Sequence, residues 1–226
     1  MRTGLLSESE TWMNTAAYIY YRALVFKKRA LRYRALFETI YRNKCRRLVE
    51  IGTYNGVHAY QMIRTAMNHH SSGEIEYFGF DLFEDLADEQ LTNELSKKPP
   101  SQATVRARLE TTGARIQLFP GDTTETLPQS VGDIGTVDFV FIDGGHSVAT
   151  IESDWGNVEK MMGEQTNVIF DDYYLNSDPE VDGMGCQSVV AGLDKSQFDV
   201  EVLPTENAFK KEWGTLRIKM VRVTRR

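Results

Sequence analysis

Three carboxylates follow two apolar stretches of the sequence, at the points where buried strands would end. Asp143 closes the run VDFVFID, and Asp171 and Asp172 close the run NVIFDD. Neighbouring parallel strands would bring the three side chains to one edge of a sheet, and hard oxygen donors gathered there suit a divalent cation. The pattern predicts a Mg²⁺ site with Asp143, Asp171 and Asp172 as ligands. The alternative is an acidic rim without metal.

A turn that contains two glycines follows an earlier strand-like run. The segment VEIGTYNG places Glu50, Gly52, Tyr54 and Gly56 together there. Such glycines let the backbone approach a ligand, and the next helix offers free backbone N–H groups. The middle glycine of the GxGxxG fingerprint is missing, which disfavours NAD and FAD. A ligand without phosphates, such as S-adenosylmethionine (SAM), fits better.

The next strand-like run ends in Asp81, about one strand–helix–strand step after the glycine turn. A carboxylate at this point can accept hydrogen bonds from both ribose hydroxyls of a nucleoside. The same residue could instead cap the helix that DLFED would open. The glycines upstream favour the ribose role.

From Leu48 onward, short apolar runs alternate with amphipathic stretches. This alternation predicts an α/β fold, with a Rossmann-like, doubly wound and mostly parallel sheet. Seven strands are expected, and the last two, FDVEVLP and TLRIKMVRV, should form an antiparallel C-terminal hairpin. Residues 1–45 are expected to form an N-terminal helical extension that acts as a lid or as a packing element. Residues 46–226 are expected to form the main domain.

The N-terminal extension is rich in aromatic and basic residues, among them Arg22, Arg29, Arg32 and Arg34. The charges are expected either to form a solvated helix face or to bind an acidic substrate. The aromatic residues could pack between subunits of a homo-oligomer.

Composition narrows the class of protein. The chain has 226 residues, of which 41% are hydrophobic, enough for one core, and its net charge of −6 makes nucleic acid an improbable partner. The two cysteines show neither metal-binding nor disulfide spacing. Without a long apolar run or a signal core, we expect a cytoplasmic protein with no membrane association.

Five segments in order, VEIGTYNG, YFGFDLF, FPGDTTETLP, VDFVFIDGGHS and VIFDDYY, resemble the class I SAM-dependent methyltransferases. The branch they resemble contains catechol O-methyltransferase-like and macrocin-type O-methyltransferases, and the resemblance spans about residues 48–194. It implies a cofactor site and a metal site. The implied cofactor-binding residues are Glu50, Gly52, Tyr54, Gly56, Asp81, Leu82, Asp122, Thr123 and Asp143, and the implied metal ligands are Asp143, Asp171 and Asp172.

The resemblance implies metal-assisted O-methylation of a small molecule with hydroxyl groups, with SAM and Mg²⁺ as cofactors and with Asp143 and His146 as catalytic residues. His146 is a candidate base that could equally cap the next helix or bind backbone. Macrocin-type enzymes often carry an acid where this chain has Gly145, which moves the role of the base towards His146. Two alternatives are a metal-independent methyltransferase acting on nitrogen or on a larger acidic acceptor, and a non-catalytic binding protein.

Overall fold

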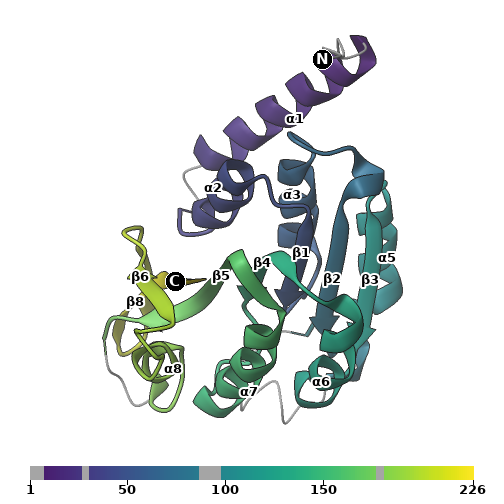
Figure 1. Cartoon of the computed structure of the whole chain (residues 1–226). Helices are drawn as coiled ribbons and strands as arrows, with labels where there is room; N and C mark the ends of the chain where they lie inside the picture. The colour runs from purple at the N-terminus through teal and green to yellow at the C-terminus, as the bar shows by residue number, and fades with distance from the viewer. Residues whose placement is uncertain (1–7, 27–30, 87–97, 177–180) are drawn as a thin grey trace.

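A sheet of eight strands forms the centre of the computed structural model, which describes residues 8–26, 31–86, 98–176 and 181–226 (Figure 1). The strand order is β3-β2-β1-β4-β5-β8-β6, and β7 pairs only with β8. Strands β1 to β5 are parallel, and β8 runs antiparallel to both β5 and β6. The strands are β1 (Arg47–Ile51), β2 (Glu76–Asp81), β3 (Arg115–Pro120), β4 (Val137–Ile142), β5 (Met162–Tyr174), β6 (Phe198–Val202), β7 (Asn207–Lys211) and β8 (Gly214–Arg225).

The α/β class, the mostly parallel sheet and the antiparallel C-terminal strands confirm the sequence-based prediction, but the sheet has one strand more than the seven expected. The additional strand, β7, pairs with the first part of β8, from Asn207 opposite Ile218 to Lys211 opposite Gly214. Four of its five residues are exposed. Because so little of this strand is buried, the hydrophobic pattern gave no sign of it.

Helices cover both faces of the sheet. One face carries α1 (Glu8–Phe26), α2 (Arg34–Asn43), α3 (Val57–Ala66) and α5 (Gln102–Glu110), and the other carries α6 (Thr123–Ile134), α7 (Val148–Val158) and α8 (Gln187–Ala191). Within the described residues, the short 3₁₀ turns are η2 (Ser72–Glu74), η3 (Phe83–Asp85) and η4 (Glu159–Met161). The sequence of residues 84–98 also predicts a helix with an acidic face, but most of this segment falls outside the described residues.

The strands alternate their side chains between the two helical layers, as the two-residue period of a strand requires. Leu48, Phe139 and Phe141 belong to the core under α2 and α3. Val49 and Val140 belong to the core under α6 and α7. Because both faces are buried, the parallel strands read as continuous apolar runs.

Helices α1 and α2 pack on α3, and α1 extends away from the rest of the molecule at the top of Figure 1. The rings of Tyr21 and Tyr41 stack between them, 4.2 Å apart and 4° from parallel. On the outer side of α1, Ile19 and Phe26 are 63% and 64% exposed. Packing between subunits through these helices stays a prediction. None of the described helices is long and apolar enough to cross a membrane.

Candidate active site

A cavity of about 640 Å³ lies at the carboxyl edge of the parallel strands. In a doubly wound sheet, this is the edge where ligands bind. The cavity brings together most of the residues that the sequence singled out. Those that line it are Gly52, Tyr54, Asp81, Leu82, Asp122, Thr123, Asp143, Gly145, His146 and Asp172.

Gly52 shapes this edge through its backbone. Its φ of +89° is in the left-handed region, and a Cβ at this position would lie 1.9 Å from the carbonyl oxygen of Asp143. The backbone N–H of Asp143 donates to the carbonyl oxygen of Ile51 at 2.8 Å. Gly52 lines the cavity, so a role beside a ligand stays a prediction, and its missing side chain also lets the loop that carries Asp143 approach closely.

Asp81 ends β2, and its carboxylate holds the walls of the cavity together. It accepts hydrogen bonds from the backbone N–H of Tyr54 at 2.6 Å and of Phe83 at 2.7 Å. Burial raises the pKa of this carboxyl, and the hydrogen bonds from Phe83 and Tyr54 oppose the rise. Asp81 thus binds the first backbone N–H of η3, but the N-cap position considered for it is occupied by Leu82, and Asp81 itself lies on the cavity wall.

Two more predicted cofactor residues lie at helix starts. Asp122 caps α6 by accepting from the backbone N–H of Thr124 at 2.9 Å, and it also faces the cavity together with Thr123. Gly56, with a φ of +70°, is the N-cap of α3 and packs against Val105, outside the cavity lining.

Glu50 lies behind the cavity wall, not on it. The residue is 1% exposed, and its carboxyl accepts a hydrogen bond from the Tyr77 hydroxyl, which itself lies 3.2 Å from the Thr53 hydroxyl. Burial raises the pKa of Glu50 to about 8, although the bond from Tyr77 works against this. Glu50 does not line the cavity, so it would act on a ligand there through the residues that lie between them.

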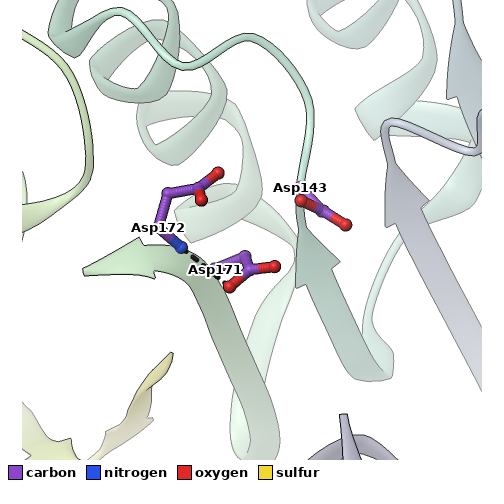
Figure 2. Close-up of side chains that lie close together, drawn as sticks. All are labelled: Asp143, Asp171 and Asp172. Carbon is purple, nitrogen blue, oxygen red and sulfur yellow. Dashed lines mark hydrogen bonds between the residues drawn. The ribbon is translucent and has the colours of Figure 1, made fainter. Parts of the chain in front are cut away.

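Asp143, Asp171 and Asp172 lie together at the ends of β4 and β5 (Figure 2). Each offers a carboxylate oxygen, and these oxygens lie within 4.8 Å of one another. A bulge in β5 between Phe170 and Tyr173 brings two consecutive acids to this edge. Asp172 adopts a left-handed φ of +58°, and its backbone N–H donates to Asp171 at 2.9 Å.

The three carboxylates, here called the acidic cluster, raise one another's pKa because they lie close together in a buried site. Desolvation, followed by the charges of Asp171 and Asp172, raises the pKa of Asp143 well above its usual range. Desolvation and the charge of Asp172 likewise raise the pKa of Asp171, against the effect of Arg32. Like charges this close favour a nearby cation.

Arg32 supplies one such cation, and the sequence did not single it out from its basic neighbours. Its Nε lies 2.8 Å from Oδ1 of Asp171 and its Nη2 lies 2.8 Å from Oδ2. Burial alone would lower the pKa of Arg32, but the charge and hydrogen bonds of Asp171 outweigh this effect, and the net result is a raised pKa. The partners are 139 positions apart, so no local pattern could have revealed this pair.

His146 lies beside the cluster, with its Nε2 3.1 Å from Oδ2 of Asp172. The N-cap of α7 is Ser147, whose hydroxyl accepts from the backbone N–H of Thr150 at 3.3 Å. The helix-capping role considered for His146 therefore belongs to its neighbour. Asp172 can orient the imidazole, as a carboxylate does beside a catalytic histidine.

Aromatic side chains close the cavity near Arg32. The rings of Tyr33 and His58 lie 4.0 Å apart, and Arg32 donates to the Tyr33 hydroxyl at 2.9 Å. Burial, and then the charge of Asp143, raises the pKa of Tyr33, so its phenol stays neutral. Burial and the charge of Arg32 lower the pKa of His58 to about 4, which leaves this imidazole uncharged at neutral pH.

The donor set of the acidic cluster fits a hard divalent cation. Carboxylate oxygens are the ligands that Mg²⁺ prefers, and Arg32 offsets only one of the three negative charges. Asp143 and Asp172 face the cavity, while Asp171 is shared with Arg32. The residues that would hold such an ion are therefore the three that the sequence predicted.

The strand order, the glycine turn after β1 and the acid at the end of β2 define a class I SAM-dependent methyltransferase. The chain belongs to a family described as a methyltransferase domain, whose model matches residues 49–173. A search of curated proteins found no match.

Solved structures share this fold at low sequence identity. The O-methyltransferase TomG from Streptomyces achromogenes, involved in tomaymycin synthesis and solved with SAM, is 16% identical with a TM-score of 0.58, over 98% of this chain and 92% of that one. An O-methyltransferase from Bacillus cereus, solved with SAH, is 14% identical with a TM-score of 0.58, over 98% and 93%. The calicheamicin methyltransferase CalS11 is 15% identical with a TM-score of 0.58, over 96% and 94%.

Proposed function

We propose that this methyltransferase transfers the methyl group of SAM to a hydroxyl oxygen of a small molecule. The observation that carries the proposal is that Gly52 and Asp81 border the same cavity as two members of the acidic cluster, Asp143 and Asp172. In this arrangement Asp81 binds the ribose of SAM, Leu82, Asp122 and Thr123 surround adenine, and the acidic cluster marks the acceptor end. O-methyltransferases among the structures of similar fold support the choice of oxygen.

The reaction needs few steps from the protein. The acceptor oxygen attacks the sulfonium methyl in line, so that an O–C bond forms, the S–C bond breaks and S-adenosylhomocysteine (SAH) leaves. His146 takes the hydroxyl proton on its imidazole, which Asp172 orients. Mg²⁺ held by Asp143, Asp171 and Asp172 would lower the pKa of the acceptor hydroxyl and help to orient it.

The charge of the cavity favours an acceptor that is not anionic. Asp81, Asp122, Asp143 and Asp172 line it, and among the described lining residues Arg32 is the sole arginine or lysine. Because Asp171 already pairs with Arg32, little positive charge remains for an acidic acceptor. A cationic methyl donor and a neutral polyhydroxylated acceptor suit these walls.

Calorimetry with SAH and a methyl-transfer assay on catechols and sugars test the proposal. We expect SAH to bind and Mg²⁺ to stimulate transfer, and Asp143→Asn should abolish turnover while SAH still binds. Glu152→Gln, an exposed change on α7, is the matched control and should leave both intact. Failure to bind SAH would instead favour a non-catalytic protein.

One observation favours a second candidate, a methyl transfer that needs no metal. The Arg32–Asp171 pair already places a protein cation within the acidic cluster. Turnover that is unchanged after EDTA treatment would select this candidate, and turnover restored only by added Mg²⁺ would select the first.

A further inference from the structure

Arg32 is held in place far more firmly than a surface arginine would be. The residue is 8% exposed, and two of its nitrogens bind the two oxygens of Asp171 in the bidentate geometry that makes arginine–carboxylate pairs strong. Oδ1 of Asp171 also accepts from the backbone N–H of Asp172. Most of the hydrogen-bonding capacity of Asp171 is therefore used within the protein.

Arg32 also joins three parts of the chain. Its backbone N–H donates to the side-chain oxygen of Asn207 on β7 at 3.1 Å, and its guanidinium lies 5.6 Å from the ring centre of Phe209. The same guanidinium lies 4.5 Å from the ring centre of Tyr33. The start of the N-terminal α2 region, the C-terminal β7–β8 hairpin and the end of β5 thus meet at one side chain.

We propose that Arg32 competes with a divalent cation for Asp171, and so couples the N-terminal helices to occupancy of the acidic cluster. A cation bound by Asp171 would lie next to the guanidinium of Arg32. Two neighbouring positive charges repel each other strongly in a partly desolvated site. Arg32 is thus a positioning residue that lowers cation affinity. The inference rests on the role given to the cluster under the proposed function.

Coupling of this kind works in both directions. If Arg32 weakens binding of the cation by some factor, the bound cation weakens the hold of Arg32 on Asp171 by the same factor. Arg32 lies two residues before α2 (Arg34–Asn43), next to its N-cap Tyr33, so loosening the Arg32–Asp171 pair should destabilise the start of α2. The bound cation should therefore speed local opening of α2.

The first experiment titrates Mn²⁺ into the whole protein without SAM, and follows free Mn²⁺ by electron paramagnetic resonance. We expect Arg32→Gln to bind Mn²⁺ about tenfold more tightly than the natural protein, with Arg32→Lys in between because it keeps the charge but loses the fork. Arg34→Gln, two positions away and without an ion pair to the cluster, is the matched control and should not change the affinity. Unchanged or weaker Mn²⁺ binding in Arg32→Gln overturns the proposal.

The second experiment needs no variant. Hydrogen exchange of α2 in the natural protein should become faster when Mn²⁺ saturates the cluster, and unchanged or slower exchange overturns the coupling. SAH affinity, measured on each protein, shows whether the cavity is intact. If neither the natural protein nor Arg32→Gln binds Mn²⁺, this inference fails, while SAH binding and transfer in EDTA would still support the methyltransferase function.

Discussion

Gly52 and Asp143 touch backbone to backbone, since a Cβ on Gly52 would fall 1.9 Å from the Asp143 carbonyl oxygen. The ends of β1 and β4 can approach this closely because residue 52 has no side chain. The proposed donor end of the cavity and the proposed acceptor end are therefore fixed relative to each other by one glycine. A change at this glycine should disturb both ends at once.

Gly52→Ala should lower the free energy of unfolding by about 2–4 kcal/mol, because the clash with rigid backbone and the φ of +89° both oppose a side chain. Urea unfolding measures the loss, and SAH titration measures the damage to the cavity. Gly156→Ala is the matched control. It lies exposed in α7 with no atom within 4 Å of its Cβ position, so it should stabilise the protein by roughly 0.5–1 kcal/mol. Equal stability of the two variants would contradict this account.

Asp81→Ala should weaken SAH binding by about 10–100-fold, as expected when hydrogen bonds to a charged group are lost. The variant loses the proposed hydrogen bonds to ribose. It also loses the carboxylate that accepts from the backbone N–H groups of Tyr54 and Phe83. Asp81→Asn keeps an acceptor oxygen and should lie between the two affinities. Calorimetry with SAH provides the measurement.

A control for Asp81 is Asp194→Ala. Asp194 also accepts from a nearby backbone N–H, that of Ser196 at 2.8 Å, but it lies outside the cavity lining. Its removal should leave SAH affinity unchanged. A similar loss of affinity in both variants would mean that the effect of Asp81 is on folding alone.

The sequence predicted which acids lie at the site because the ends of buried strands can be recognised in it. An apolar run that stops at an acid places that acid at the edge of the sheet, and this reasoning brought Asp81, Asp143 and Asp172 to one cavity. It also predicted that Asp143, Asp171 and Asp172 lie together. Whether these residues bind SAM and metal stays a prediction.

What the sequence could not predict depends on long-range contacts. Arg32 looked like its basic neighbours, since its partner Asp171 lies 139 positions away. Glu50 follows the pattern of a cofactor-binding acid, yet its side chain turns into the core towards Tyr77. Strand β7 has almost no buried face, so periodicity could not detect it.

Glu50 should make stability depend on pH. Its pKa is raised from 4.5 to about 8 in the folded protein, so the folded state holds a proton that the unfolded chain releases above pH 4.5. The stabilisation is complete below the unfolded pKa and is lost as the pH rises through the folded pKa. The free energy of unfolding should therefore fall between pH 5 and 8, by at most about 1.4 kcal/mol per pH unit.

Urea unfolding of Glu50→Gln at several pH values checks this expectation. The amide keeps the shape of the protonated acid but cannot ionise, so its stability should change less over this range than that of the natural protein. Glu164→Gln, an exposed position on β5, should keep the natural dependence. Parallel curves for Glu50→Gln and the natural protein would show that Glu50 does not hold a proton near neutral pH.

His146→Gln separates a base from a structural residue. The glutamine amide can still donate to Asp172, as the Nε2 of His146 is placed to do, but it cannot accept a proton at neutral pH. If His146 is the base, kcat should fall by about 10²–10⁴-fold while SAH affinity stays the same. A histidine base makes kcat/KM fall towards acid pH, and the variant should lose this dependence.

His70→Gln is the control for this experiment, because that ring contacts the carbonyl oxygen of Lys44 and lies outside the cavity lining. It should leave the rate and the pH profile as they are. Near-natural turnover in His146→Gln, with the acidic limb retained, would remove His146 as the base. Since Ser147 already caps α7, such a result would leave the bond to Asp172 as the main role of His146. The proton would then have to leave through another group of the cavity, and Asp143, which faces the cavity with a raised pKa, would be the next residue to test.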